Sequence, residues 1–190
     1  TQKTLRGPRG GFILSRAAHA SKIDAAVFPG SQGGPLMHAI AAKAVCFLEA
    51  SLPSFKDYAA AIVANARIIS DVFLEEGLRV VSGGNDNHLV LVDLANLNMT
   101  GKEAQDALER AGIVANRNKI PYDTRSAMIA GGLRVGSPAI TTRGFSPAET
   151  RTVAKFICDV LREPSSDTVR RRVLSSVLEL CERHPIPGLM

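Results

Sequence analysis

The 190-residue sequence contains no tryptophan, and aromatic residues make up only 5% of it. Surfaces that bind single-stranded nucleic acid stack bases on aromatic side chains, so this scarcity argues against such a surface. The net charge of +5 does not reverse the argument, because the basic residues are scattered along the chain. The dense cluster Arg170–Arg172 lies in a helical pattern, where a solvated face explains it. We therefore expect no nucleic-acid partner, and a small anionic ligand fits the charge at least as well.

The sequence also lacks an apolar run long enough to cross a bilayer, which argues against a membrane partner. Its three cysteines, Cys46, Cys158 and Cys181, are an odd number without metal-ligand spacing. Reduced thiols of this kind are typical of a cytoplasmic protein. The Gly-x-Ser-x-Gly and Gly-x-Gly-x-x-Gly motifs are absent, which excludes the hydrolase and dinucleotide-binding classes that depend on them.

Glycine and proline divide the first part of the sequence into irregular stretches and helices. The short apolar run Phe12–Leu14 predicts a buried strand. Pro35 precedes an alanine-rich helix predicted over 36–50. Pro53 begins a second long helix, which we expect to end at Gly77.

Strands and helices alternate in the rest of the chain. Capping boxes at Thr100 and Ser146 each begin a helix. The predicted strands are 78–81, 88–94, 113–115 and 133–135, and the predicted helices are 100–110, 146–162 and one from Asp167 that stops before Pro185. This alternation predicts an α/β domain from residue 53 onward. Residues 1–52 resemble the tail of a larger domain whose body would lie upstream.

Lys3 is the first candidate for chemistry, because it lies in irregular, glycine-rich backbone close to Arg6 and Arg9. A lysine amine attacks an aldehyde when it is neutral, and burial or a nearby cation lowers its pKa towards that state. A single lysine is more often a solvated surface residue. The local pattern alone leaves both roles open.

The longer string Thr1–Gly11 resembles the cofactor-lysine motif of serine hydroxymethyltransferases. Three further segments resemble the signatures of that family in the family's order, and Thr142–Phe145 follows the last of them as it does in the family. They are Ala26–His38, Ser82–Leu94 and Leu133–Ala139. The resemblance implies a fold-type I transferase dependent on pyridoxal phosphate. Residues 1–52 would be the tail of its large domain with a dimer-contacting helix, and residues 53–190 its small C-terminal α/β domain.

The resemblance also implies four cofactor-binding residues. Lys3 would bind pyridoxal phosphate through its amine, and Arg9 would be a positive charge on the phosphate side. Gly33 and Gly34 match glycines that reach into the neighbouring subunit's site and contact the phosphate, where the lack of a side chain allows backbone amides to approach. Such a shared site implies a homodimer or homotetramer.

Two further residues match the substrate-binding residues of the family. Arg134 matches the arginine that binds the amino-acid carboxylate, for which a guanidinium fork is well suited. Asn118 matches an asparagine that meets the pteridine ring of the folate. Without the resemblance, Arg134 could equally form an ion pair at a strand edge, and Asn118 would be a polar loop residue. The implied activity is interconversion of serine and glycine, with tetrahydrofolate as the co-substrate that accepts the one-carbon unit.

The sequence departs from the family at Gln2, where a histidine usually precedes the lysine. The remaining cofactor contacts of the family, among them the aspartate at the pyridinium nitrogen, would lie upstream of Thr1. We therefore expect the 190 residues alone to be inactive. The alternatives are another fold-type I aldolase or aminotransferase and a non-catalytic fragment.

Overall fold

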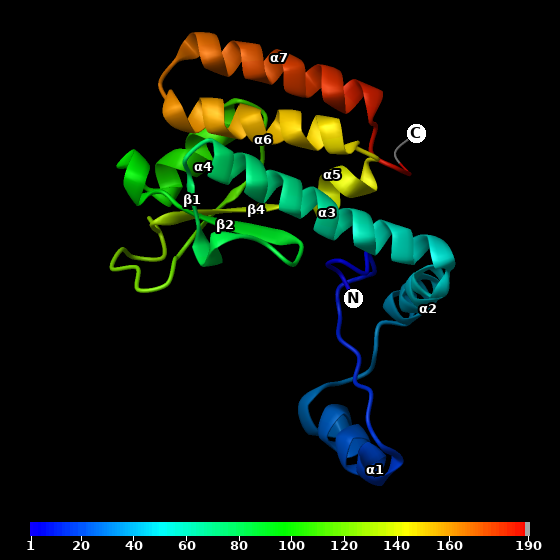
Figure 1. Ribbon diagram of the computed structural model, residues 1–190. Helices are drawn as coiled ribbons and strands as arrows, with labels where there is room; N and C mark the ends of the chain where they lie inside the picture. Colours follow the sequence, from blue (N-terminus) through cyan, green and yellow to red (C-terminus); the bar gives the residue numbers. More distant parts are fainter. Residues whose placement is uncertain (189–190) are drawn as a thin grey trace. The chain divides into compact units, whose positions relative to one another are not determined.

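The computed structural model describes residues 1–188 (Figure 1). Its backbone contacts divide the chain into two compact units, Thr1–Asp57 and Tyr58–Met190. Helix α3 (Pro53–Glu75) contributes residues to both units. The assignment of 1–52 to a large-domain tail and of 53–190 to a small domain stays a prediction.

The first unit consists of irregular backbone and short helical elements. These are α1 (Ala17–Ala25), the adjoining π-helical segment η1 (Ala26–Ser31) and α2 (Met37–Ser51). The helix predicted over 36–50 is confirmed as α2. The strand predicted at Phe12–Leu14 is wrong, because these residues are irregular and Leu14 is 85% exposed. A strand needs a neighbouring strand to pair with, and residues 1–57 contain none.

The second unit contains a four-stranded antiparallel sheet in the order β1-β2-β4-β3. The strands are β1 (Arg79–Val80), β2 (Leu89–Asp93), β3 (Asn116–Asn118) and β4 (Gly132–Gly136). The strands predicted around 78–81, 88–94 and 133–135 are therefore confirmed.

The strand predicted at Ile113–Ala115 is wrong. These residues are irregular, Val114 is 90% exposed, and the strand begins at Asn116. Strand β3 lies at the edge of the sheet and pairs only with β4. Hydrogen bonding to one neighbour, rather than burial of apolar side chains, defines such a strand, so an apolar pattern could not locate it.

The helices of the second unit begin where the sequence predicts. Helices α4 (Gly101–Arg110) and α6 (Pro147–Arg162) each follow a complete capping box, and α7 (Asp167–Arg183) begins at the predicted residue. A short helix, α5 (Pro138–Thr142), lies between β4 and α6. Helix α3 ends just before Gly77, whose φ of +77° suits glycine at a helix end.

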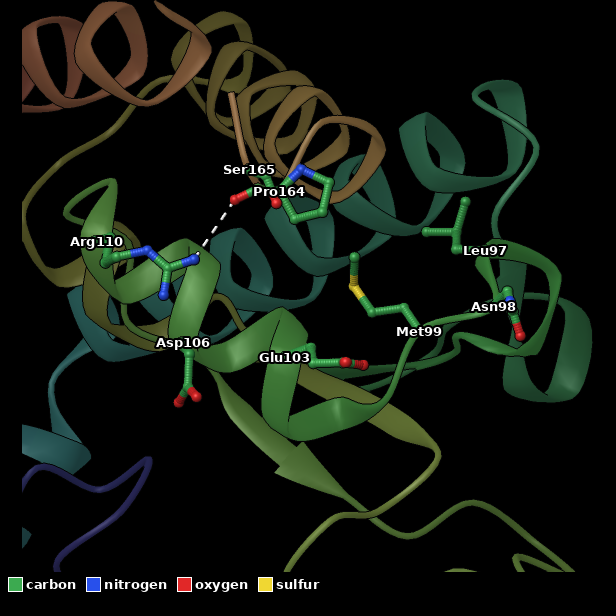
Figure 2. Close-up of a pocket in the computed structure, with 8 residues that line it drawn as sticks. All are labelled: Leu97, Asn98, Met99, Glu103, Asp106, Arg110, Pro164 and Ser165. Carbon is green, nitrogen blue, oxygen red and sulfur yellow. Dashed lines mark hydrogen bonds between the residues drawn. The ribbon is translucent and has the colours of Figure 1, made fainter. Parts of the chain in front are cut away.

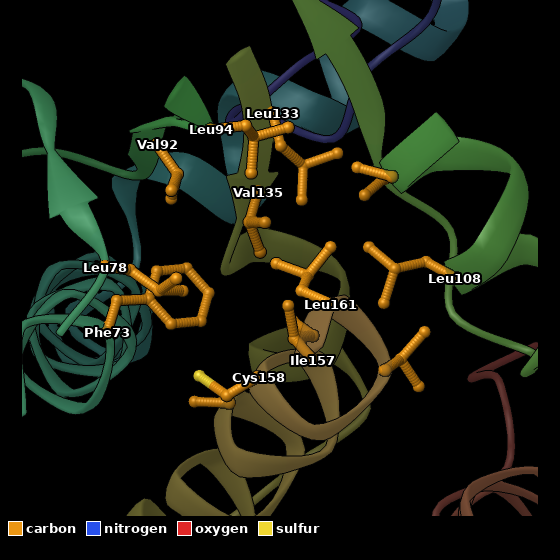
Figure 3. Packing of buried hydrophobic residues seen from close by; sticks show 14 of the residues in the cluster. Phe73, Leu78, Val92, Leu94, Leu108, Leu133, Val135, Ile157, Cys158 and Leu161 are labelled. Atoms are coloured by element: carbon orange, nitrogen blue, oxygen red, sulfur yellow. The ribbon is translucent and has the colours of Figure 1, made fainter. Parts of the chain in front are cut away.

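Side chains of the two central strands alternate between the two faces of the sheet. On one face the buried side chains of β2 and β4 pack against α3, α4 and α6 (Figure 3). The four strand residues on that face are Val90, Val92, Leu133 and Val135. Helix α7 packs along α6 (Figure 1). The opposite side, called here the open face, carries Leu89, Leu91, Asn116, Asn118 and Arg134, all of them at least partly exposed.

Candidate active site

A cavity of about 430 Å³ lies at the open face. The sheet supplies Leu89, Leu91, Asn118 and Arg134 to its lining. The loop between β1 and β2 supplies the remaining residues, which are Val81, Ser82, Gly84, Asn85, Asp86 and Asn87. Two residues singled out from the sequence, Asn118 and Arg134, thus line one cavity because β3 and β4 are neighbours in the sheet.

Arg134 lies in the middle of β4, directly between Leu91 of β2 and Asn116 of β3 in the strand register. Its Nη2 donates a hydrogen bond to Oδ1 of Asn116 over 3.3 Å. Among residues 1–188, no carboxylate lies within ion-pair distance of it. The other guanidinium N–H groups can therefore bind the carboxylate of a ligand in the bidentate geometry that arginine favours.

Asn118 lies at the end of the edge strand, and its Nδ2 donates to the carbonyl of Lys119 over 2.7 Å. Strand β3 is also tied to α4, because Oε1 of Gln105 accepts a hydrogen bond from the backbone N–H of Arg117 over 3.0 Å. The edge strand is therefore held on both sides, by β4 and by α4. This positions the amide of Asn118 at the cavity.

Asparagine side chains shape the loop on the other side of the cavity. Oδ1 of Asn85 accepts from the backbone N–H of Asn87 over 3.2 Å. Oδ1 of Asn87 in turn accepts from the backbone N–H of Leu89 over 2.8 Å. The sequence indicated this loop only as part of the Ser82–Leu94 segment, without a role for its asparagines. The density of Asn and Asp between two strands was the available signal that the loop adopts a defined shape.

Lys3 lies in a loop that folds back on itself. The backbone N–H of Arg6 donates to the carbonyl of Lys3, and that of Gly7 donates to the carbonyl of Thr1, each over 2.9 Å. The amino nitrogen of Thr1 donates to the carbonyl of Gly10 over 2.8 Å. The side chain of Lys3 is exposed at this turn.

Helix α2 supports the Lys3 loop from one side. Sγ of Cys46 lies 3.2 Å from the carbonyl oxygen of Leu5 and donates to it. A Cβ placed on Gly7 would lie 2.6 Å from the same sulfur, so a larger residue there would displace the Cys46 side chain. Nζ of Lys43 donates to the carbonyl of Gly11 over 2.8 Å. The loop is therefore fixed while its lysine stays accessible; Arg9, in the same loop, is also exposed.

Gly33 and Gly34 precede α2 and are exposed. A Cβ on either would meet nothing within 4 Å, and neither has the positive φ that favours glycine. The chain's own conformation and packing therefore do not require glycine at these positions. Close approach of a group from outside the chain does supply a reason, and it fits the predicted contact with a cofactor phosphate.

A second cavity of about 340 Å³ lies between α4 and the connection from α6 to α7 (Figure 2). The charged side chains that line it are engaged in hydrogen bonds within the protein. Glu103 caps α4, and the backbone N–H at the N-cap holds its pKa below the usual value. A hydrogen bond from Lys102 does the same for the pKa of Asp106. Arg110 donates to the carbonyl of Pro164 over 3.4 Å. These are structural roles, and we assign this cavity no catalytic function.

His184, at the end of α7, is part of a polar cluster. Its side chain is 20% exposed, and Nε2 lies 2.9 Å from Oε1 of Glu149. The imidazole packs on the ring of Phe145, and Arg143 donates to the carbonyl of His184 over 2.6 Å. Hydrogen bonds from the backbone N–H of Ser146 and from His184 lower the pKa of Glu149 to about 2. This cluster fixes the end of α7 against the turn that follows α5.

Residues 1–188 contain no group of His, Cys, Asp and Glu side chains arranged to hold a metal ion. No helix within those residues combines the length and the apolar composition that crossing a membrane requires.

Comparison with known families assigns the chain. A serine hydroxymethyltransferase family model matches residues 1–157, which is most of the sequence. The chain belongs to the serine hydroxymethyltransferase family. The family resemblance and the fold class predicted from the sequence are thereby confirmed.

Three curated serine hydroxymethyltransferases illustrate the similarity. The chain is 53% identical over 186 residues to that of Polynucleobacter necessarius, which covers 98% of this chain. It is 52% identical to serine hydroxymethyltransferase 1 of Pseudomonas aeruginosa over 188 residues and 52% identical to the Aromatoleum aromaticum protein over 189. The matched segment is 45% of the length of each relative. The chain therefore spans less than half of the length of these relatives.

Proposed function

We propose that this chain supplies the substrate-carboxylate and folate contacts of a cytoplasmic serine hydroxymethyltransferase. The enzyme would interconvert serine and glycine and pass the one-carbon unit to tetrahydrofolate, with pyridoxal phosphate as cofactor. The observation that carries the proposal is that Arg134 and Asn118 line one cavity, in a chain of this family.

Arg134 would bind the amino-acid carboxylate. Its guanidinium has N–H groups that no carboxylate of residues 1–188 engages, and a bidentate pair with a carboxylate fixes orientation as well as distance. Holding the carboxylate fixes the rotation of the bonds at the α carbon, which decides the bond that breaks. Asn118 would contact the pteridine ring from the same cavity, because its amide offers both a donor and an acceptor.

Four residues of the first unit would hold the cofactor. Lys3 would bind its aldehyde carbon through the side-chain amine, and Arg9 would add positive charge on the phosphate side. Gly33 and Gly34 would approach the phosphate in the site of a neighbouring subunit, which makes the enzyme a homodimer or homotetramer. When bound, pyridoxal phosphate supplies an electron sink for the bond broken at the α carbon.

A different aldolase or an aminotransferase of the same fold would also use an arginine for the carboxylate. It would have no use for a residue that contacts a folate. The presence of Asn118 in the cavity with Arg134 therefore favours transfer to tetrahydrofolate.

A chimeric enzyme tests the proposal. In the Polynucleobacter relative, the segment that matches this chain is replaced by the chain itself, which is feasible at 53% identity. We expect the chimera to form glycine from serine in the presence of tetrahydrofolate. Arg134→Lys keeps the charge but loses the fork, and it should raise the KM for serine by about tenfold or more.

Arg67→Lys is the matched control, since Arg67 lies on the exposed side of α3. It should leave the KM for serine unchanged. A chimera that folds and binds pyridoxal phosphate yet gives the same KM with Arg134→Lys would refute the role of Arg134. Glycine formation unaffected by Asn118→Ala at limiting tetrahydrofolate would refute the folate contact.

A further inference from the structure

We propose that Asn116 is a positioning residue for Arg134. Its neutral amide oxygen holds the guanidinium in the orientation that receives a carboxylate, and it does so without neutralising the charge. This inference rests on the proposed function, in which Arg134 binds the carboxylate of the amino acid. Asn116 itself would not contact the substrate.

The strand register places Asn116 directly beside Arg134. In the antiparallel pair β3–β4 the two residues are Cα partners, so their side chains project from the same face of the sheet. Nη2 of Arg134 donates to Oδ1 of Asn116 over 3.3 Å. On the other side of Arg134, its partner on β2 is Leu91, an apolar side chain that offers no hydrogen bond. The hydrogen bond therefore fixes the guanidinium from one side only.

The support of Asn116 does not depend on the ligand. Strand β3 pairs with β4 along its whole length, and Gln105 of α4 accepts a hydrogen bond from the neighbouring residue, Arg117. The amide oxygen is thus in place before any substrate arrives. A long arginine side chain loses rotamer freedom when it is fixed, and the hydrogen bond to Asn116 restricts Arg134 before the substrate binds.

The neutrality of residue 116 matters as much as its hydrogen bond. A carboxylate at the same position would form an ion pair with Arg134 and compete with the carboxylate of the substrate. Asn and Asp have nearly the same shape and differ in charge. Residue 116 therefore determines whether the charge of Arg134 is available to a ligand.

Two carboxylates of the second unit, Asp86 and Asp93, do not take the place of Asn116 as a partner of Arg134. Asp86 lies in the β1–β2 loop that lines the same cavity, and it forms no ion pair with Arg134. Asp93 lies on β2, where it pairs with Arg79 over 3.0 Å and accepts from the backbone N–H of Ala95 over 2.9 Å. Asn116 is the residue of the described chain whose side chain contacts the guanidinium through a hydrogen bond.

The test uses the chimeric enzyme with pyridoxal phosphate bound, and five variants, one of which is Arg134→Ala. Asn116→Ala removes the acceptor, Asn116→Asp adds a competing charge, and Asn116→Gln keeps an amide. Asn96→Ala is the matched control, because Asn96 is an exposed asparagine that also makes one hydrogen bond, from Nδ2 to the carbonyl of Gly77. Circular dichroism confirms that each variant folds, and the Kd for glycine is measured at equilibrium beside kcat and KM for serine.

We expect Asn116→Ala to raise the Kd for glycine about three- to tenfold, the effect of losing one hydrogen bond. Asn116→Asp should raise it further than Asn116→Ala, while Asn116→Gln stays closer to the original chain. The KM for serine should rise in parallel with the Kd. The kcat should change by less than about threefold, as expected when an interaction of equal strength in the ground state and the transition state is lost. Asn96→Ala should change none of these constants.

The ranking of alanine and aspartate decides between positioning and a structural role. A structural role would make aspartate the milder change, because its shape is closer to asparagine; that ranking would overturn the inference. So would Asn116 variants whose Kd equals that of Asn96→Ala. If Arg134→Ala itself leaves the Kd for glycine unchanged, the proposed carboxylate site is wrong, and the failure lies with the proposed function rather than with Asn116.

Discussion

Replacing Thr150 by valine should stabilise the protein. Thr150 lies on α6 and is fully buried, and its Oγ1 is one of two buried side-chain polar atoms in residues 1–188 without a hydrogen-bond partner. A buried hydroxyl that lacks a partner costs about 1–3 kcal/mol, because it has lost its hydrogen bonds to water. Valine has nearly the same shape, so the substitution removes that cost without opening a cavity.

The expected gain is about 1 kcal/mol, the lower end of that range. For a cooperative unit of this size, such a gain raises Tm by about 3–5 °C. Thermal unfolding followed by circular dichroism measures Tm, and urea unfolding measures the free energy of unfolding with its m-value. An unchanged m-value shows that the difference lies in stability rather than in compactness.

Thr152→Val in the same helix is the control. Thr152 is exposed, and its Oγ1 donates to the carbonyl of Ala148 over 3.0 Å. That substitution should change the free energy of unfolding by less than about 0.5 kcal/mol. A lower Tm for Thr150→Val, with Thr152→Val unchanged, would refute the reasoning, since it would show that the buried hydroxyl makes a stabilising interaction.

Three further predictions concern other parts of the second unit. Gly132→Ala should lower the free energy of unfolding by about 2 kcal/mol or more in urea, because its Cβ would lie 2.5 Å from Ile120 and 2.7 Å from a backbone oxygen of β2; an unchanged value would contradict the close packing. The pKa of Glu149, about 2 instead of 4.5, predicts stabilisation that is complete above pH 4.5 and is lost as the pH falls towards 2. Urea unfolding at pH 7 and pH 3 should show this loss. The difference in the free energy of unfolding between the two pH values should be smaller in the Glu149→Gln variant. Burial raises the pKa of Cys158 to about 12, so a maleimide at pH 8 should label the partly exposed Cys181 and leave Cys158 unlabelled until urea unfolds the chain.

Local signals predicted most helices of this chain. The capping boxes at Thr100 and Ser146 fix the starts of α4 and α6 through hydrogen bonds between residues three apart, and Gly77 ends α3 through its own backbone conformation. Such features depend only on neighbouring residues, so they can be recognised without the fold.

Features that depend on distant partners were missed. Strand β3 consists of polar residues, and only its pairing with β4 makes it a strand. The apolar run at Phe12–Leu14 looked like a strand but has none beside it in the first unit. The contact of His184 with Glu149 joins residues far apart in sequence, and the residues next to His184 do not predict it.

The candidate site was predicted in part. Family motifs identified Arg134 and Asn118, and the register of β3 and β4 then brought them to one cavity. Asn116 was passed over, because an asparagine on an unrecognised strand has no special position. Its place beside Arg134 follows from the pairing of the two strands. The roles of Lys3 and Arg9 stay predictions.

The alternation of side chains along β4 has a consequence for how this site can evolve. Leu133 and Val135 belong to the core, while Arg134, between them, belongs to the cavity. Inserting or deleting one residue ahead of them would exchange the two sets, placing a guanidinium among the helices and two apolar side chains in the cavity. Stability and the proposed binding of a carboxylate by Arg134 would be lost together. New specificities can therefore arise here by substitution, whereas changes of length must fall in the connecting loops.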